Sequence, residues 1–253
     1  MLIETITSRH NAVLTHLRKL ASSRAYREEC GEYLGDGVKL LREAVTWNAP
    51  LRTVVFTERV TLPPLPETVR AVRVSEELMR SVSPSETPQG ALFTAELIRP
   101  TLPDQLEGRH YLVLDGVQDP GNVGTILRTA DAFACDGVFL TGACADLYNP
   151  KTVRATMGAI FRCRVWCCGA KELAALLRES GLTLWGAALR GDTISLPEAK
   201  LERVAVAIGS EGRGLSEQLL ALCDHTVKIP MSPRCESLNA ATAATVLLWE
   251  MYQ

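Results

Sequence analysis

Short apolar runs alternate with segments of helical periodicity along the carboxyl-terminal part of the chain. The apolar runs are typical of buried strands and lie at 111–114, 137–141, 163–167, 182–188, 204–208 and 226–229. Helices are expected between and after them, at 122–134, 150–157, 170–179, 215–223 and 238–252. This alternation predicts an α/β domain with a mainly parallel sheet and helices on both faces.

The amino-terminal part predicts a smaller α/β domain. A helix capped by residues 8–11 is expected to continue through Leu20, with further helices at 38–47 and 76–83 and strands at 53–57, 69–74 and 90–94. Two prolines at 100 and 103 hinder regular structure after this region and stiffen the chain. We therefore expect a small domain over 1–97, a linker over 98–108 and a larger domain over 109–253.

Composition narrows the possible classes of protein. With 253 residues and 47% hydrophobic content, the chain can bury a sizeable core, and its net charge of −2 gives no overall basic surface for nucleic acid. The eight cysteines contain no C-x-x-C pair and the four histidines form no ligand-spaced cluster, so no metal site is expected. The sequence shows no secretory leader and no apolar run of membrane-spanning length, which favours a cytoplasmic protein without a membrane partner.

Positive charge is concentrated near the amino terminus. Among the first 27 residues, Glu4 is the one acidic residue, and the basic residues are Arg9, Arg18, Lys19, Arg24 and Arg27. Such a cluster can track an RNA backbone, and it can equally be a solvated helix face. Both interpretations stay open from the sequence.

A glycine-rich turn follows the apolar run at 204–208. Its spacing is G-x-x-G-x-G over 209–214, and a second apolar run ends nearby at Ile229. Glycines let a ligand approach the backbone, so we expect a ligand crevice where these strands end, although an ordinary tight turn is the simpler alternative. The spacing differs from the G-x-G-x-x-G of dinucleotide-binding folds, which argues against a dehydrogenase.

Three segments, in this order, resemble the motifs of the SpoU/TrmH family of RNA ribose methyltransferases. They are LDGVQDPGNVGTILRTA at 114–130, GSEGRGL at 209–215, and 229–239, which contains Ile-Pro-Met and then Glu-Ser-Leu-Asn. The stretch NPKTVRATMGA at 149–159 also resembles a family segment, and the whole resemblance covers 112–252. It implies a carboxyl-terminal trefoil knot, a homodimer, and a first domain that binds substrate. One departure is Asp36, where the family commonly carries glutamate.

The resemblance also implies roles for individual residues. It assigns catalysis to Asn122 and Arg128, and we interpret Arg128 as an electrostatic stabiliser because a guanidinium stays protonated. Three further polar residues are candidates for the active site, with helix-terminal stabilisation as their alternative role: Glu211, Ser237 and Asn239.

The methyl donor that the resemblance implies is S-adenosylmethionine. Backbone groups and apolar side chains suit its adenine, and the candidates are Gly209, Gly212, Ile229, Met231 and Leu238. Without the motifs, Ile229 and Leu238 would be assigned to the core. Lys151 and Arg154 are candidate phosphate contacts.

Together these observations predict a cytoplasmic, homodimeric enzyme that methylates ribose 2′-hydroxyls of RNA. The two-domain form resembles the members that act on ribosomal RNA. Alternatives are a transfer-RNA 2′-O-methyltransferase and a non-catalytic RNA-binding protein of the same fold. A base-modifying methyltransferase of the knotted class matches the motifs less well.

Overall fold

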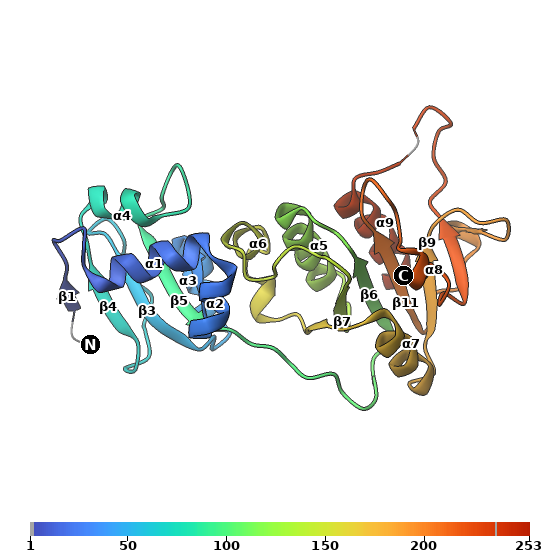
Figure 1. Cartoon of the computed structure of the whole chain (residues 1–253), viewed down its shortest axis with the longest axis horizontal. Coiled ribbons are helices and arrows are strands. Elements are labelled where there is room, and N and C mark those ends of the chain that lie inside the picture. Colours follow the sequence, from blue (N-terminus) through green and yellow to red (C-terminus); the bar gives the residue numbers. More distant parts are fainter. Residues whose placement is uncertain (1–2, 236) are drawn as a thin grey trace. The chain divides into compact units, whose positions relative to one another are not determined.

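The computed structural model describes residues 3–235 and 237–253, and the chain forms two compact units (Figure 1). The first unit contains the chain through Ile98 together with Asp146–Arg162. The second contains Arg99–Ala145 and Cys163–Gln253. The packing of Asp146–Arg162 with the amino-terminal unit departs from the predicted domain boundary, which placed this segment in the larger domain.

The first unit is built on a mixed five-stranded sheet in the order β1-β4-β3-β5-β2. Strands β1, β4 and β3 are parallel, and β5 runs antiparallel to β3 and β2. The strands are β1 (Ile3–Thr5), β2 (Glu32–Asp36), β3 (Leu51–Phe56), β4 (Arg70–Arg73) and β5 (Ala91–Glu96). The helices are α1 (Ala12–Ser22), α2 (Arg24–Cys30), α3 (Val38–Thr46), α4 (Glu76–Val82) and α6 (Pro150–Ala155), followed by the 3₁₀ turn η1 (Ala159–Phe161).

Helices cover both faces of this sheet. Helices α1 and α4 pack on one face, where Leu17 and Met79 are fully or almost fully buried. Helices α3 and α6 pack on the other, with Leu41 and Val153 in the same cluster as Phe93 of β5. Helix α6 therefore completes the core of the first unit, although its sequence neighbours belong to the second.

The second unit contains a seven-stranded sheet in the order β10-β12-β9-β11-β6-β7-β8, in which every pairing is parallel. The strands are β6 (His110–Asp115), β7 (Gly137–Thr141), β8 (Val165–Cys167), β9 (Thr183–Ala187), β10 (Ile194–Ser195), β11 (Val204–Gly209) and β12 (His225–Lys228). The helical elements are α5 (Pro120–Ala132), α7 (Ala170–Glu179), η2 (Leu196–Glu198), α8 (Glu217–Leu220) and α9 (Ala240–Tyr252).

Helices lie on both faces of this sheet as well. Leu173 of α7 and Leu219 of α8 pack against Val113 and Ala207, which share one face. Helix α5 contacts α9, and the two also contact β7 and β11 respectively. The predicted parallel α/β architecture is therefore confirmed. Within the described residues, no helix is both long and apolar enough to cross a membrane.

Candidate active site at the carboxyl ends of β6 and β11

The candidate site lies where the order of strands reverses. Strand β6 is the first strand of its sheet, with β7 on one side and β11 on the other. In register, Asp115 at the end of β6 stands between Gly209 of β11 and Thr141 of β7. Open parallel sheets bind ligands at such a switch point, beyond the carboxyl ends of the strands.

The buried Asp115 links the end of the glycine-rich turn to this edge of the sheet by a hydrogen bond. Asp115 accepts a hydrogen bond from Thr141 Oγ1 at 2.9 Å and another from the backbone N–H of Ser216 at 2.7 Å. Residues 210–216 are thereby held against the end of β6. Asp115 was not among the predicted site residues, although its place after an apolar run and before a glycine was an available signal.

The two glycines predicted to contact the cofactor have different surroundings. A Cβ on Gly209 would lie 1.9 Å from the backbone carbon of Gly214, so the absence of a side chain at 209 is required by the fold itself. A Cβ on Gly212 would meet nothing within 4 Å. The turn is closed by paired backbone hydrogen bonds between Ser210 and Gly214, of 3.0 and 2.8 Å. Gly212 is exposed, and the space beside it is open.

Three of the predicted catalytic residues meet here. Asn122 lies in the first turn of α5, where its Nδ2 donates a hydrogen bond to Glu211 Oε1 of the glycine-rich turn. Asn239 Nδ2 donates to Asn122 Oδ1 at 3.2 Å. Asn239 is also the N-cap of α9, because its Oδ1 accepts from the backbone N–H groups of Ala241 and Thr242. Its two predicted roles, capping and membership of the polar site, are thus compatible.

The other predicted residues of the site differ in exposure. Arg128 lies further along α5, and its guanidinium has no hydrogen bond or ion pair within the described part of the chain. Ser237 is exposed, Ile229 and Leu238 are half-buried, and Met231 is 41% exposed. Ile229, Met231 and Leu238 thus present apolar surface in the segment between β12 and α9. Glu236 of the third motif lies outside the described residues.

One residue of the predicted RNA-binding cluster, Arg27, is buried and does not lie at the surface. Arg27 is 3% exposed, and its guanidinium donates to the carbonyl of Leu20 at 2.6 Å and to Asp146 Oδ2 at 2.7 Å. It therefore holds the segment that begins at Asp146 to α2, and its inclusion in an RNA-contacting surface was wrong. Its helical spacing from Arg24 did not reveal which side of α2 faces inward.

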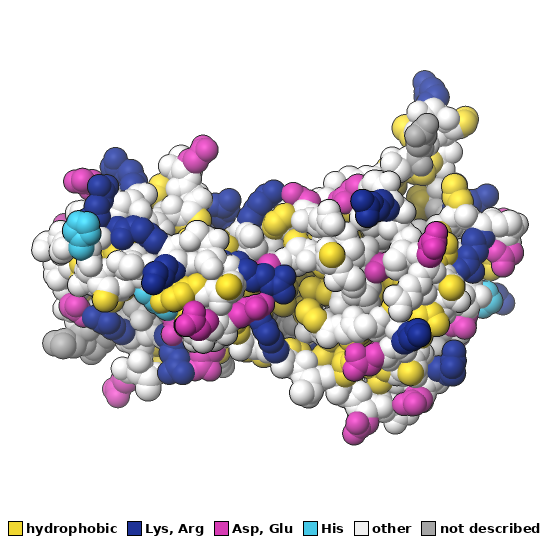
Figure 2. Space-filling view, in the orientation of Figure 1, with side chains coloured by type: hydrophobic (Ala, Val, Ile, Leu, Met, Phe, Trp, Pro, Cys, Tyr) yellow, Lys and Arg dark blue, Asp and Glu magenta, His cyan; other side chains and the backbone are white. Residues whose placement is uncertain are grey.

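The remaining basic residues near the amino terminus stay at the surface. Arg9, Lys19 and Arg24 are exposed, and Arg24 pairs with Glu28 at 3.0 Å. Arg18 is half-buried and donates to the carbonyl of Arg9. On the face shown in Figure 2, Lys and Arg side chains are interspersed with Asp and Glu, so positive charge does not form one continuous field there.

The two candidate phosphate contacts of the 149–159 segment belong to the first unit. Lys151 and Arg154 are both exposed on α6. Arg154 Nη1 lies 3.9 Å from Oδ2 of Asp36, at the end of β2.

Fold and site define a two-unit α/β protein with a polar site at the switch point of a parallel sheet. Residues 109–249 match the SpoU rRNA Methylase family, and residues 11–92 match the MRM3-like substrate binding domain. The first match covers more than half of the chain. The chain therefore belongs to the SpoU rRNA methylase family.

Relatives align with almost the whole chain. The 23S rRNA (guanosine(2553)-2′-O)-methyltransferase RlmP of Bacillus subtilis is 29% identical and aligns with 98% of this chain and 99% of its own length. A 23S rRNA (uridine(2479)-2′-O)-methyltransferase of Streptomyces viridochromogenes is 33% identical over 97% of this chain and 90% of its own. The crystal structure of an AdoMet-bound rRNA methyltransferase from Sinorhizobium meliloti superposes with a TM-score of 0.87 at 26% identity, covering 98% of this chain and 97% of that one.

Proposed function

We propose that this protein transfers a methyl group from S-adenosylmethionine to a ribose 2′-hydroxyl of ribosomal RNA. The observation that carries the proposal is the hydrogen-bonded set Asn122, Glu211 and Asn239 at the ends of β6 and β11. All three lie inside the segment that matches the SpoU family. One relative is named as a 23S rRNA guanosine 2′-O-methyltransferase and another as a 23S rRNA uridine 2′-O-methyltransferase.

The residues at this edge fit S-adenosylmethionine. Gly212 leaves open space beside the turn, and the half-buried Ile229 and Leu238 offer apolar surface for an adenine. We propose these three with Met231 as the residues that hold the cofactor, together with the backbone at Gly209. When bound, S-adenosylmethionine supplies a methyl group already activated by its sulfonium.

The residues of the chain then have to orient the ribose and stabilise charge. Asn122 is held from two sides, by Glu211 and by Asn239, so its amide has a fixed orientation before substrate arrives. Arg128 carries a permanent positive charge and has no partner in the described part of the chain, so it is available to a ribose oxygen or phosphate. We assign it the stabilisation of the developing alkoxide, with the hydroxyl proton passing to water or phosphate.

A direct assay tests the proposal. Purified protein is incubated with methyl-labelled S-adenosylmethionine and ribosomal RNA from a strain lacking the gene. Label should enter the RNA, and the modified nucleotide should resist alkaline hydrolysis of its 3′-phosphodiester, as expected of a 2′-O-methyl group. Label found only on a base, or no transfer by protein that binds the cofactor, would contradict the proposal.

RNA recognition by the first unit is part of this proposal. The predicted domain division of 1–97, 98–108 and 109–253 is modified in it, because Asp146–Arg162 packs with the first unit. The support for RNA recognition is the match to a substrate-binding domain and the exposed Lys19 and Arg24. Because Asp146–Arg162 packs with the first unit, deleting residues 1–97 would uncover its apolar side chains. Charge-removing variants of the full chain, compared across salt concentrations, are therefore the better test.

We further propose a homodimer that folds with a carboxyl-terminal trefoil knot and works in the cytoplasm. The dimer is supported by Trp249 and Tyr252, which are 51% and 57% exposed on α9 and both contact Phe133, the C-cap residue of α5. Native mass spectrometry of the wild type and a Trp249→Glu variant tests it, because a buried charge would weaken such an interface. The described cysteines form no disulfide bonds, as is typical of proteins from a reducing compartment. Family membership supports the knot.

A further inference from the structure

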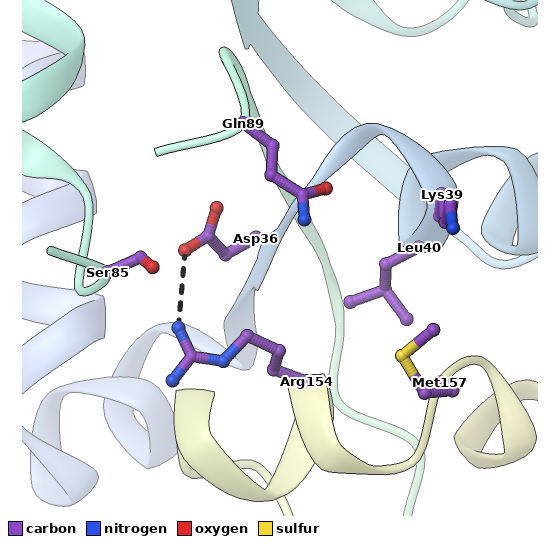
Figure 3. Close-up of a pocket in the computed structure, with 7 residues that line it drawn as sticks. All are labelled: Asp36, Lys39, Leu40, Ser85, Gln89, Arg154 and Met157. Atoms are coloured by element: carbon purple, nitrogen blue, oxygen red, sulfur yellow. Dashed lines mark ion pairs between the residues drawn. The ribbon is translucent and has the colours of Figure 1, made fainter. Parts of the chain in front are cut away.

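The first unit has a pocket of its own, which the proposed methyl transfer does not use (Figure 3). It lies between the end of β2, the start of α3, the loop before β5 and helix α6. Its cavity has a volume of about 70 Å³, and the space including the open mouth is about 460 Å³. Its walls combine one carboxylate, several hydrogen-bond donors and two apolar side chains.

The carboxylate belongs to Asp36, which is buried at 7% exposure. Its Oδ2 accepts a hydrogen bond from Ser83 Oγ at 3.3 Å and lies 3.9 Å from Nη1 of Arg154. Its Oδ1 has no hydrogen bond within the described residues, and Figure 3 shows this oxygen directed away from Arg154. Burial is the main cause that raises the pKa of Asp36, against the opposing effects of Ser83 and Arg154. Oδ1 is not among the fully buried atoms that lack a partner, so this oxygen is open to the pocket and free to accept a hydrogen bond from a ligand there.

Hydrogen-bonding groups without partners surround this oxygen. The side-chain amide of Gln89 and the hydroxyl of Ser85 form no hydrogen bond within the described part of the chain, and both line the pocket. The Gln89 amide lies against the backbone of Gly37, where a Cβ would be 2.8 Å from its Oε1. Lys39 and Arg154 add two cations. An acceptor thus stands beside several donors.

Two apolar side chains complete the lining. Leu40 is buried, whereas Met157 is 46% exposed at the edge of the pocket. Met157 also has a φ of +50°, which is costly for a residue with a side chain and tends to occur at functional positions. A flexible thioether beside polar groups is suited to the face of a planar ring.

We propose that this pocket binds one unstacked nucleotide of the RNA substrate, with a base N–H donating to Asp36 Oδ1. A neighbouring base acceptor receives a hydrogen bond from Gln89 or Arg154, the ring lies on Met157 and Leu40, and Lys39 faces a phosphate. Nucleobase edges place donors beside acceptors, and RNA is read mainly where unstacked bases expose these edges. The inference rests on the proposed function and adds a recognition site outside the polar set of the second unit.

The methyl group of Met157 provides a local probe. Full-length protein with ¹³C-methyl methionine is titrated with the four ribonucleoside 5′-monophosphates, with single-stranded and duplex RNA of ten nucleotides, and with inorganic phosphate. The Met157 signal, assigned with Met157→Leu, should shift with single-stranded RNA and with at least one monophosphate. The buried Met79 of the same unit is the internal control. No shift at saturating single-stranded RNA, or an equal shift with phosphate alone, would overturn the proposal.

Variants then test the polar contacts. Gln89→Ala removes an exposed side chain without internal partners and should weaken single-stranded RNA binding at this site about tenfold. Gln105→Ala, an exposed glutamine of the second unit, is the matched control and should leave it unchanged. Asp36→Asn replaces an acceptor by an amide and should change which monophosphate binds best. Equal affinities in wild type and Gln89→Ala would contradict the assignment.

The experiment separates this inference from the proposed function. Methyl transfer to ribosomal RNA without any Met157 shift would reject the nucleotide pocket and leave the enzyme activity standing. A shift of the Met157 signal in a protein that transfers no methyl group would support RNA binding at the pocket and contradict the proposed methyltransferase activity.

Discussion

Asn239 donates a side-chain hydrogen bond to Asn122 at 3.2 Å, although 117 positions separate the two in the sequence. The bond joins the N-cap of α9 to the first turn of α5. Asn122 in turn donates a hydrogen bond to Glu211, in the turn after β11. The start of α5, the turn after β11 and the N-cap of α9 thus form one polar site. A parallel sheet brings residues distant in sequence together in this way, because the segments after its strands meet at one edge.

Removing the central amide should therefore lower activity more than stability. For Asn122→Ala we expect turnover to fall about 10²-fold, because Glu211 and Asn239 lose their common partner and the site its orientation. Unfolding free energy should change by about 1 kcal/mol or less, since the side chain is partly exposed. Single-turnover methylation and chemical unfolding measure the two. Thr242→Ala, exposed in the first turn of α9, is the control and should keep full turnover.

Sequence reasoning reached the parallel sheet because its buried strands are apolar throughout. The strand ends and glycines indicated a ligand crevice after β11, whereas the catalytic candidates Asn122, Glu211 and Asn239 came from the resemblance to the family motifs. Sequence reasoning missed α2 and β2, whose stretch at 24–36 is mostly polar and lacks a clear apolar period. The packing of Asp146–Arg162 with the first unit depends on contacts such as Tyr148 with Tyr33, at 4.7 Å between rings, and no local pattern reveals these.

The two glycines of the turn should respond differently to the same substitution. Gly209→Ala forces a Cβ against the backbone of Gly214, so thermal stability should fall clearly. Gly212→Ala meets no atom of the protein, so the fold should be retained. If S-adenosylmethionine lies beside Gly212, calorimetry should show weaker binding by about tenfold or more. Unchanged affinity in folded Gly212→Ala would place the cofactor elsewhere.

Arg27 and Arg24 lie three residues apart, yet they should affect different properties. Arg27→Ala leaves Asp146 without its buried partner, and we expect a loss of about 3 kcal/mol in unfolding free energy. Arg24→Ala should cost about 0.5 kcal/mol or less, because its pair with Glu28 is exposed. If the surface contacts RNA, Arg24→Ala should also reduce the salt dependence of RNA binding. The same salt dependence in Arg24→Ala and wild type would remove this residue from the RNA contact.

The unfolding free energy of the protein should depend on pH through the titration of Asp36. Since burial raises the pKa of its carboxyl, the folded chain holds this proton more tightly than the unfolded chain. The resulting contribution to folding is complete below about pH 4 and is lost as pH rises through the folded pKa. Asp36→Asn cannot titrate. Its unfolding free energy relative to the wild type should therefore increase from pH 4 towards neutrality, and a difference that stays constant with pH would contradict the assignment.

Arg128 should act on turnover and leave cofactor binding unaffected. Its side chain is exposed on α5, so Arg128→Ala should fold normally and bind S-adenosylmethionine with unchanged affinity. Loss of one charge-stabilising group typically costs about 10²–10³ in rate, and Arg128→Lys should rescue only partly because an ammonium lacks the planar fork. Filter binding of the cofactor and single-turnover methylation of ribosomal RNA separate the two effects.

Mixing variants tests whether Arg128 serves the site of its own subunit. Arg128→Ala is combined with a Gly212 variant shown to be folded and unable to bind cofactor. In a dimer with sites shared between subunits, one site of the heterodimer receives both lesions and the other receives neither, so activity should return towards half per heterodimer. If each site is built by one chain, every site keeps one lesion and the mixture stays inactive. Native mass spectrometry must show the heterodimer in the same sample, because only then does missing activity assign Arg128 to its own subunit's site.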